Sequence, residues 1–286
     1  MTDSSIVQTT ETFTASDGYS FFIHHWQLNT LPLGVVVCLH GIQSHAGWYG
    51  KSCAELAKAG FDVRFLDRRG SGLNKRDRGH TVHAERLVND VVQFLTSIRG
   101  DEPIFLTGIS WGARLAAVIA KRRPDLIAGL TLLCPGIYGR VGPRWYQRLA
   151  LKAAMAVGKI HHRVKIPLAD PALFTNEPDQ QEFIRTDENT LREITTSLVV
   201  AGIILEREAQ AAADSIQVPT LLTLAGTDRI IDNPATRDWF TRLPTNEKTL
   251  IEYPNAAHTL EFEHDCPFII DWQKWLETQV ARAARA

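Results

Sequence analysis

Ser110 has the local surroundings of a chemical nucleophile. Residues 108–112 read Gly-Ile-Ser-Trp-Gly, which matches the pattern G-x-S-x-G. The apolar run IFLTGI before the serine predicts a buried strand, and WGARLAAVIAKR after it predicts a helix. A serine in such a sharp turn holds its hydroxyl out at the carboxyl end of a sheet, and the glycines are needed because larger side chains would collide there. A surface serine in a glycine-rich turn is the alternative interpretation.

The strand, serine and helix together resemble the nucleophile elbow of α/β-hydrolases, whose chain order is serine, acid and histidine. A serine hydroxyl is a poor nucleophile at neutral pH and needs a base to take its proton. Of the ten histidines, only His258 and His264 lie in the last third of the chain. His258 follows a strand predicted over residues 248–253, whereas His264 begins the terminal helix, where a capping or solvated role is expected. The resemblance therefore implies His258 as general base, with a structural loop histidine as the alternative.

The acid that orients the histidine is expected at the end of the preceding strand. Asp228 follows a strand predicted over residues 219–224. Asp232 is the local rival, but the run Asp-Asn-Pro that it opens is typical of a helix start, so we expect a capping role there. Asp228 is therefore predicted to orient His258 and to stabilise its protonated form.

Acyl transfer also needs hydrogen-bond donors for the oxyanion. The resemblance implies the backbone N–H of Trp111 as one donor and that of Ile42 as the other, in the loop over residues 39–45. This loop departs from the HGGG and HGxG forms because Gln43 replaces the later glycine. His40 is expected to brace the loop through ring hydrogen bonds.

A glycine- and arginine-rich loop follows the next predicted strand. Residues 67–72 read Asp-Arg-Arg-Gly-Ser-Gly and resemble the D-x-R-G-x-G loop common among α/β-hydrolases. The glycines allow a compact turn, and an arginine can bind carboxylates or carbonyls. A phosphate-binding loop is the alternative, but no Gly-Lys-Ser/Thr run follows and the motif does not lead directly into a helix.

The elements that must position these residues alternate between strands and helices. Asp17-Gly18 predicts a two-residue hairpin turn, and residues 81–98 have an apolar helical stripe that begins at Val82. The predicted strands span residues 11–16, 19–28, 35–39, 61–66, 103–107, 126–133, 219–224 and 248–253. The predicted helices span residues 49–59, 81–98, 111–123, 234–241 and a terminal stretch from about 266. This alternation predicts an α/β fold: a mostly parallel sheet with helices on both faces and an antiparallel hairpin at one edge.

One segment interrupts the alternation. Residues 136–215 show no clear strand, and residues 145–157 and 191–212 look helical. We expect a helical cap insertion over residues 136–215 that shapes access to the site. The core domain then comprises residues 1–135 and 216–286.

Several motifs together narrow the resemblance. The runs LHGIQSHAGWY, DRRGSG and AGTDRIIDN, with NAAHTLEFE near the end, look like the monoacylglycerol lipase / lysophospholipase-like group, which is grouped with serine aminopeptidase-type hydrolases. The likeness covers residues 11 to about 276. It implies hydrolysis of carboxylic esters such as monoacylglycerol or lysophospholipid through an acyl-enzyme, without metal or organic cofactor.

Other functions fit the same residues. Amide or peptide hydrolysis, or hydrolysis of a carbon–carbon bond, can use the same triad. Haloalkane dehalogenase and epoxide hydrolase activities are disfavoured because those chemistries use an aspartate where Ser110 stands. A ligand-binding hydrolase-fold protein is the non-catalytic alternative, which the presence of a complete triad argues against.

Apolar residues suggest where an acyl chain could bind. The predicted pocket residues are Trp48 near the oxyanion loop and Trp145, Tyr146 and Ile203 in the cap, although packing of the cap onto the core is the alternative role. The Trp111 side chain could narrow the pocket. An amphipathic cap helix could also make transient contact with a lipid surface.

Composition excludes several classes of protein. The chain has 286 residues, 44% of them hydrophobic, and a net charge of −1, which gives no net electrostatic attraction to nucleic acid. Its apolar runs are too short to span a bilayer, and its polar N-terminus lacks a signal-peptide core. The four cysteines form no CxxC pair, and Cys38 and Cys134 lie in apolar runs. Buried free thiols and a cytoplasmic location are expected.

Overall fold

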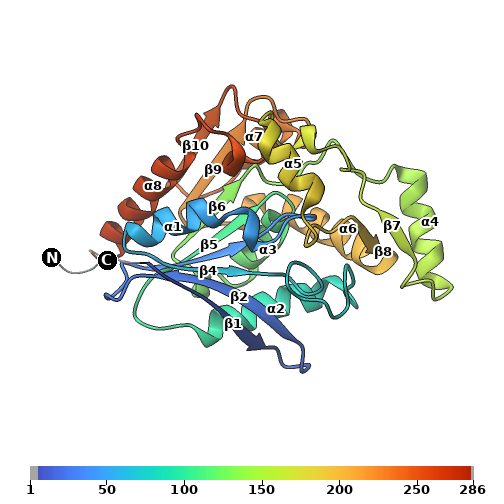
Figure 1. Ribbon diagram of the computed structural model, residues 1–286, viewed down its shortest axis with the longest axis horizontal. Helices are drawn as coiled ribbons and strands as arrows, with labels where there is room; N and C mark the ends of the chain where they lie inside the picture. The colour runs from blue at the N-terminus through green and yellow to red at the C-terminus, as the bar shows by residue number, and fades with distance from the viewer. Residues whose placement is uncertain (1–5, 285–286) are drawn as a thin grey trace.

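An eight-stranded sheet forms the centre of the protein, with helices against both of its faces (Figure 1). The computed structural model describes residues 6–284, so residues 1–5 of the polar N-terminal stretch lie outside it. The strands of the sheet are β1 (Val7–Thr14), β2 (Ser20–Gln27), β3 (Val35–Leu39), β4 (Asp62–Leu66), β5 (Ile104–Ile109), β6 (Gly129–Leu133), β9 (Thr220–Ala225) and β10 (Lys248–Tyr253). Their order is β1-β2-β4-β3-β5-β6-β9-β10. The pairs β1–β2 and β2–β4 are antiparallel and the others parallel, which confirms the predicted sheet.

The helices lie on both faces of the sheet and, for α4 and α5, apart from it (Figure 1). They are α1 (Gly50–Lys58), α2 (Ala84–Ser97), α3 (Gly112–Arg122), α4 (Trp145–Ala156), α5 (Pro178–Thr186), α6 (Thr196–Gln210), α7 (Asn233–Thr241) and α8 (Phe268–Ala283). On one face α1 packs beside α8, and on the other α2, α3 and α6 pack together (Figure 1). The strand β3 serves both layers because its side chains alternate: Val35 and Val37 join the apolar cluster of α2 and α3, and Val36 and Cys38 join that of α1 and α8.

The opening hairpin differs from the predicted two-residue turn. Ala15 N donates to Tyr19 O, and Gly18 N donates to Ala15 O, so the loop has three residues between the paired ones. Gly18 has φ +74°, the left-handed conformation that closes a three-residue hairpin loop. The Tyr19 N–H donates to the Asp17 carboxylate, which stabilises this wider turn.

The helix α2 begins three residues later than predicted. His83 caps it by accepting a hydrogen bond from Arg86 N through its ring. Val82 therefore lies outside the helix and is exposed, so its place in the apolar stripe was wrong. A histidine cap is not among the common capping residues, which is why the sequence pattern missed this start.

The segment between β6 and β9 also contains strands that the sequence analysis missed. β7 (Arg163–Lys165) and β8 (Glu193–Thr195) form a small antiparallel sheet, and α5 lies between them in the chain. Strands of three residues are too short to show an alternating pattern. The helix α6 follows β8 directly, and its buried Leu198, Ala201 and Leu205 belong to the apolar cluster of α2 and α3.

Two predictions about whole-chain properties can be compared with the structure. Cys38 and Cys134 are buried and unpaired, as expected for core thiols. Within the described residues, no helix combines the length and the apolar character needed to cross a membrane.

Candidate active site

The carboxyl ends of five parallel strands meet at one edge of the sheet. Leu39 pairs with Gly108, Ile109 with Leu133, Leu133 with Thr223, and Ala225 with Tyr253, so β3, β5, β6, β9 and β10 end side by side. The loops that leave these ends carry Ile42, Ser110, Asp228 and His258. Open α/β sheets bind ligands at this edge.

Ser110 occupies a strained turn that only close packing can maintain. It has φ +51°, a left-handed conformation that is uncommon for residues other than glycine. A Cβ on Gly108 would stand 2.5 Å from Ala113 Cα, and one on Gly112 would stand 2.3 Å from Leu39 O. The two glycines of the motif are therefore required because α3 begins directly against β5 and β3.

The three side chains predicted as a triad lie together in one hydrogen-bonded chain. His258 Nε2 lies 2.9 Å from Ser110 Oγ, and His258 Nδ1 lies 2.7 Å from Asp228 Oδ2. Asp228 and His258 are both buried. Because the ionised carboxylate can only accept, the Nδ1 position carries the proton and Nε2 is left to accept from the serine hydroxyl.

The Asp228 carboxylate is held in its ionised form. Its Oδ1 accepts hydrogen bonds from Ile230 N at 2.8 Å and Ile231 N at 3.0 Å. Burial opposes ionisation, but the interaction with His258 and these two backbone bonds outweigh it, and the pKa of Asp228 lies below its usual value. The rival Asp232 caps α7 by accepting from Ala235 N, which confirms its predicted capping role.

The two peptide N–H groups predicted as oxyanion donors have no hydrogen-bond partner in the part of the chain that the structure describes. Within residues 6–284, neither Ile42 N nor Trp111 N donates a hydrogen bond to another protein group. The peptide of Trp111 is fixed through its other side, because Ser110 O accepts from Gly136 N at 2.7 Å and from Ala113 N at 3.1 Å. In a planar trans peptide the N–H points away from the C=O, so the Trp111 N–H has a fixed direction.

His40 has the bracing role expected of it. Its Nδ1 donates to Gly41 O at 2.7 Å, and its Nε2 accepts from Arg68 N at 2.9 Å. Complete burial lowers the pKa of His40 well below its usual value, and the nearby Arg68 adds to this. The neutral ring therefore links the loop after β3 to the loop after β4.

The Asp67 carboxylate fills the loop over residues 67–72, so the loop has no space for a phosphate. Asp67 accepts from Ala46 N at 2.9 Å and from Leu73 N at 2.8 Å. A Cβ on Gly72 would stand 2.1 Å from Asp67 Oδ2. Burial alone would raise the pKa of Asp67, but the hydrogen bond with His24 and the other favourable contacts lower it to about 2. The phosphate-binding alternative does not fit this arrangement.

The four predicted pocket residues occupy different environments. Trp48 is buried and packs against Phe174, whose ring meets His258 edge-on at 6.0 Å between centroids. Trp145 and Tyr146 are exposed on α4, and Ile203 is partly buried on α6. The exposed pair does not pack onto the core, and a pocket role for all four remains a prediction.

Asp187 in the inserted segment was missed by the sequence analysis. Its Oδ2 accepts hydrogen bonds from His45 Nε2, Trp48 Nε1 and Thr190 Oγ1 at 2.7–2.8 Å. His45 Nδ1 accepts from Gly47 N, which places the ring proton on Nε2. Asp187 thus fastens the inserted segment to the loop beside Ile42. No local pattern could have revealed this link, because His45 and Trp48 are more than a hundred residues away from Asp187 in the sequence.

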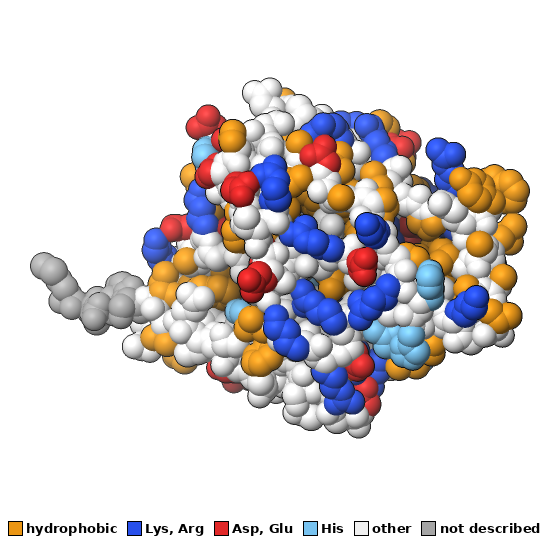
Figure 2. Space-filling view, turned by 45° about the vertical axis from the view of Figure 1, so that its right-hand side comes forward, with side chains coloured by type: hydrophobic (Ala, Val, Ile, Leu, Met, Phe, Trp, Pro, Cys, Tyr) orange, Lys and Arg blue, Asp and Glu red, His pale blue; other side chains and the backbone are white. Residues whose placement is uncertain are grey.

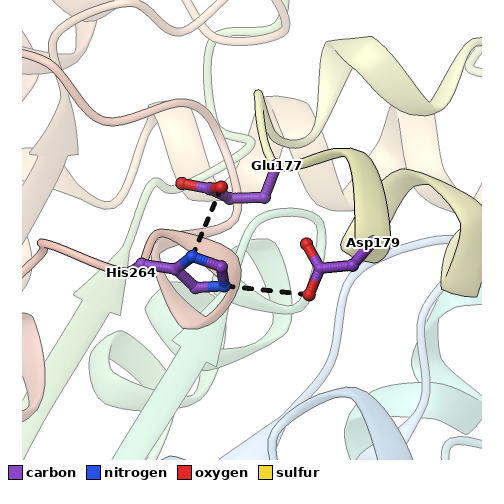
Figure 3. A group of neighbouring side chains, drawn as sticks. All are labelled: Glu177, Asp179 and His264. Carbon is purple, nitrogen blue, oxygen red and sulfur yellow. Dashed lines mark ion pairs between the residues drawn. The ribbon is translucent and has the colours of Figure 1, made fainter.

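His264, the rival histidine, lies away from Ser110 in an ion-paired surface group. Its ring stands between Glu177 and Asp179, with N–O distances of 3.3 and 3.8 Å (Figure 3). The side chain is 58% exposed, as expected for the predicted solvated role. These contacts link the start of α5 to the loop before α8.

The sheet order and the elbow at its centre define an α/β-hydrolase fold. A family model described as "Serine aminopeptidase, S33" matches residues 30–265, and the chain belongs to this family. The monoacylglycerol lipase of Mycolicibacterium smegmatis is 24% identical over 271 residues, which cover 93% of this chain and 96% of that protein.

Two further likenesses bear on the extent of the fold. The crystal structure of Paleococcus ferrophilus monoacylglycerol lipase matches with a TM-score of 0.80 at 24% identity, over 96% of this chain and 99% of that one. An uncharacterized abhydrolase domain-containing protein of Dictyostelium discoideum is 27% identical over 91% of this chain, which spans 28% of that longer protein.

Proposed function

We propose that the protein is a serine hydrolase that cleaves carboxylic esters through an acyl-enzyme. The hydrogen-bonded chain from Asp228 through His258 to Ser110 supports this proposal most strongly. The Ile42 and Trp111 amides support it further, because they make no hydrogen bond within residues 6–284 and an oxyanion needs such donors.

The proposed reaction has two steps. His258 Nε2 takes the proton of Ser110 as Oγ attacks the ester carbonyl, and the Ile42 and Trp111 amides stabilise the oxyanion. The alcohol leaves with the proton from His258. Water then attacks the acyl-enzyme, with His258 again as base and Asp228 stabilising the imidazolium in both steps. Each proton transfer is completed by side chains of this chain, without metal or organic cofactor.

The proposed substrates are small lipid esters such as monoacylglycerol or lysophospholipid. Similarity to monoacylglycerol lipases supports this choice, together with the apolar residues around the site. We also propose that residues 136–215 act as a cap. Because α6 packs on α3 of the core, we propose that the part of this segment that covers the active site ends before α6. We also propose a cytoplasmic location, which the buried free thiols support.

A series of aryl esters from acetyl to dodecanoyl tests this proposal. We expect kcat/KM to rise with chain length by up to about fourfold per methylene until the acyl site is filled, because each buried CH₂ contributes about 0.8 kcal/mol. A preference for acetyl ester would indicate that Trp111 closes the pocket and would contradict a lipid substrate. No hydrolysis of any ester would favour amide or carbon–carbon bond hydrolysis, or ligand binding.

The helix α4 is proposed as a lipid-surface contact. No residue of α4 is buried, and Trp145 is 75% and Leu149 56% exposed. Figure 2 shows hydrophobic side chains gathered at the end of the molecule that α4 forms in Figure 1, with basic side chains nearby. Such an apolar face beside cations suits the interface of a bilayer.

Replacing the two most exposed apolar side chains of α4 should weaken vesicle binding. For the double variant Trp145→Ser/Leu149→Ser we expect at least about tenfold weaker partition onto phosphatidylcholine–phosphatidylglycerol vesicles. Leu31→Ser/Ile270→Ser removes exposed apolar side chains elsewhere and serves as the matched control. An equal loss of vesicle binding in both double variants, or no loss in either, would contradict a specific role for α4.

A further inference from the structure

Arg68 is a buried cation whose hydrogen bonds go to the loop that carries the Ile42 amide. The residue is only 9% exposed. Its Nη1 donates to Gly41 O at 3.2 Å, and its Nη2 donates to Ile42 O at 3.2 Å and to Ser71 Oγ at 3.1 Å. Arg68 Cζ also lies 4.6 Å from the centre of the Trp111 ring. One guanidinium therefore contacts both residues whose amides are proposed as oxyanion donors.

This burial is costly, because Arg68 has no direct counter-ion. Its neighbour Arg69 forms ion pairs with Asp90 at 2.8 Å and Asp17 at 3.0 Å, but within residues 6–284 no carboxylate forms one with Arg68. Arg68 Nε also has no hydrogen-bond partner there. Burial lowers the pKa of Arg68 to about 9, with Asp67 opposing the shift, so the guanidinium is charged at neutral pH. A buried charge held mainly by carbonyls and an aromatic face adds little to stability.

The Gly41 carbonyl, which Arg68 and His40 both bind, determines where the Ile42 N–H points. Gly41 O accepts from Arg68 Nη1 and from His40 Nδ1, and the peptide between Gly41 and Ile42 is trans. Because a trans peptide is planar, holding the Gly41 carbonyl toward Arg68 holds the Ile42 N–H in the opposite direction. Gly41 itself lies against the nucleophile, since a Cβ there would stand 3.4 Å from Ser110 Cβ.

We infer that Arg68 is a positioning residue for the oxyanion site: it orients the Ile42 amide and supports the Trp111 side chain. This inference rests on the proposed esterase function. Gln43 stands where the HGxG form has a glycine, and the hydrogen bonds of Arg68 hold the loop just before this position. The neighbouring Arg69, which contacts carboxylates instead of this loop, has a structural role.

The test compares the same change at two adjacent buried arginines. Lysine is a point donor and cannot bind two carbonyls with one planar fork. We expect Arg68→Lys to lower kcat about tenfold and Arg68→Met about a hundredfold, with KM nearly unchanged. The oxyanion forms only in the transition state, so a misdirected donor weakens the stabilisation of that state and not the binding of the substrate. Arg69→Lys should lower Tm and leave kcat unchanged. Rates are taken per active site, titrated to completion with a fluorophosphonate.

A tetrahedral analogue separates positioning from a general structural effect. The affinity for a boronic acid, which places an oxygen in the oxyanion site, should fall in the Arg68 variants by the same factor as kcat. If Arg69→Lys lowers kcat and this affinity as much as Arg68→Lys does, the inference is overturned. If Arg68→Met does not fold, the kcat and the boronic acid affinity of Arg68→Lys alone test the inference.

The orientation of the peptide can be measured without any catalytic assay. A crystal structure of Arg68→Lys or Arg68→Met is expected to show the Gly41–Ile42 peptide rotated or in two orientations. An unchanged peptide together with unchanged kcat would overturn the inference while the esterase function stands. If the wild-type protein hydrolyses no ester, the proposed function fails, and the orientation of this peptide still decides whether Arg68 positions it.

Discussion

Ser110→Ala is expected to lower ester hydrolysis by about 10⁴- to 10⁶-fold, because no other group can form the acyl-enzyme. The variant should fold normally, since the change removes only the hydroxyl that contacts His258 Nε2. The backbone of the turn stays fixed by Gly108 and Gly112, which do not depend on the serine side chain. Initial rates on the preferred aryl ester, with Tm measured on the same samples, test this expectation.

The matched control for this variant is Ser197→Ala. Ser197 is buried and its hydroxyl donates to Thr81 O at 2.6 Å, so the substitution removes a hydrogen-bonded hydroxyl away from the strand ends. Its hydrolysis rate should stay close to that of the wild type. Hydrolysis by Ser110→Ala at more than a hundredth of the wild-type rate would contradict the nucleophile assignment.

Asp228→Asn is expected to lower kcat by about 10⁴-fold while the site keeps its geometry. Oδ1 of residue 228 accepts two backbone N–H groups, from Ile230 and Ile231. The asparagine oxygen must therefore keep that position, and its NH₂ group must face His258 Nδ1. A donor at this point favours the tautomer with the proton on Nε2, which cannot accept the proton of Ser110.

Asp232→Asn provides the control for the acid. It makes the same chemical change four positions later, where asparagine caps a helix as well as aspartate does. We expect its kcat to stay within about twofold of the wild type. A larger fall in kcat for Asp232→Asn than for Asp228→Asn would contradict the assignment and would identify Asp232 as the acid.

The local chemistry of the elbow made much of this site predictable. The run around Ser110 combines a strand, two glycines and a helix, and each is required by contacts with the neighbouring strands. Asp228 and His258 could be predicted because each follows a strand that ends at the same edge of the sheet. The roles of Asp228 and Asp232 could be distinguished because helix capping has its own sequence pattern.

The contacts made by long-range partners could not be predicted in this way. Asp187 and Arg68 gain their roles from groups that are distant in the sequence. The motif over residues 67–72 indicated that an arginine could bind carbonyls, but it did not show which carbonyls Arg68 would bind. The short strands β7 and β8 were missed because three residues give no period. The start of α2 was misplaced because a histidine ring took the place of a common cap. In each case the tertiary contact, rather than a local preference, decided the structure.

The measurement that tests the central claim most directly is the intact mass of the enzyme after acid quenching during turnover of a dodecanoyl aryl ester. We predict a population heavier by one dodecanoyl group, with the added mass on the peptide that contains Ser110 and absent from Ser110→Ala. Turnover without any such adduct in wild type, or an adduct on another residue, would contradict a Ser110 acyl-enzyme.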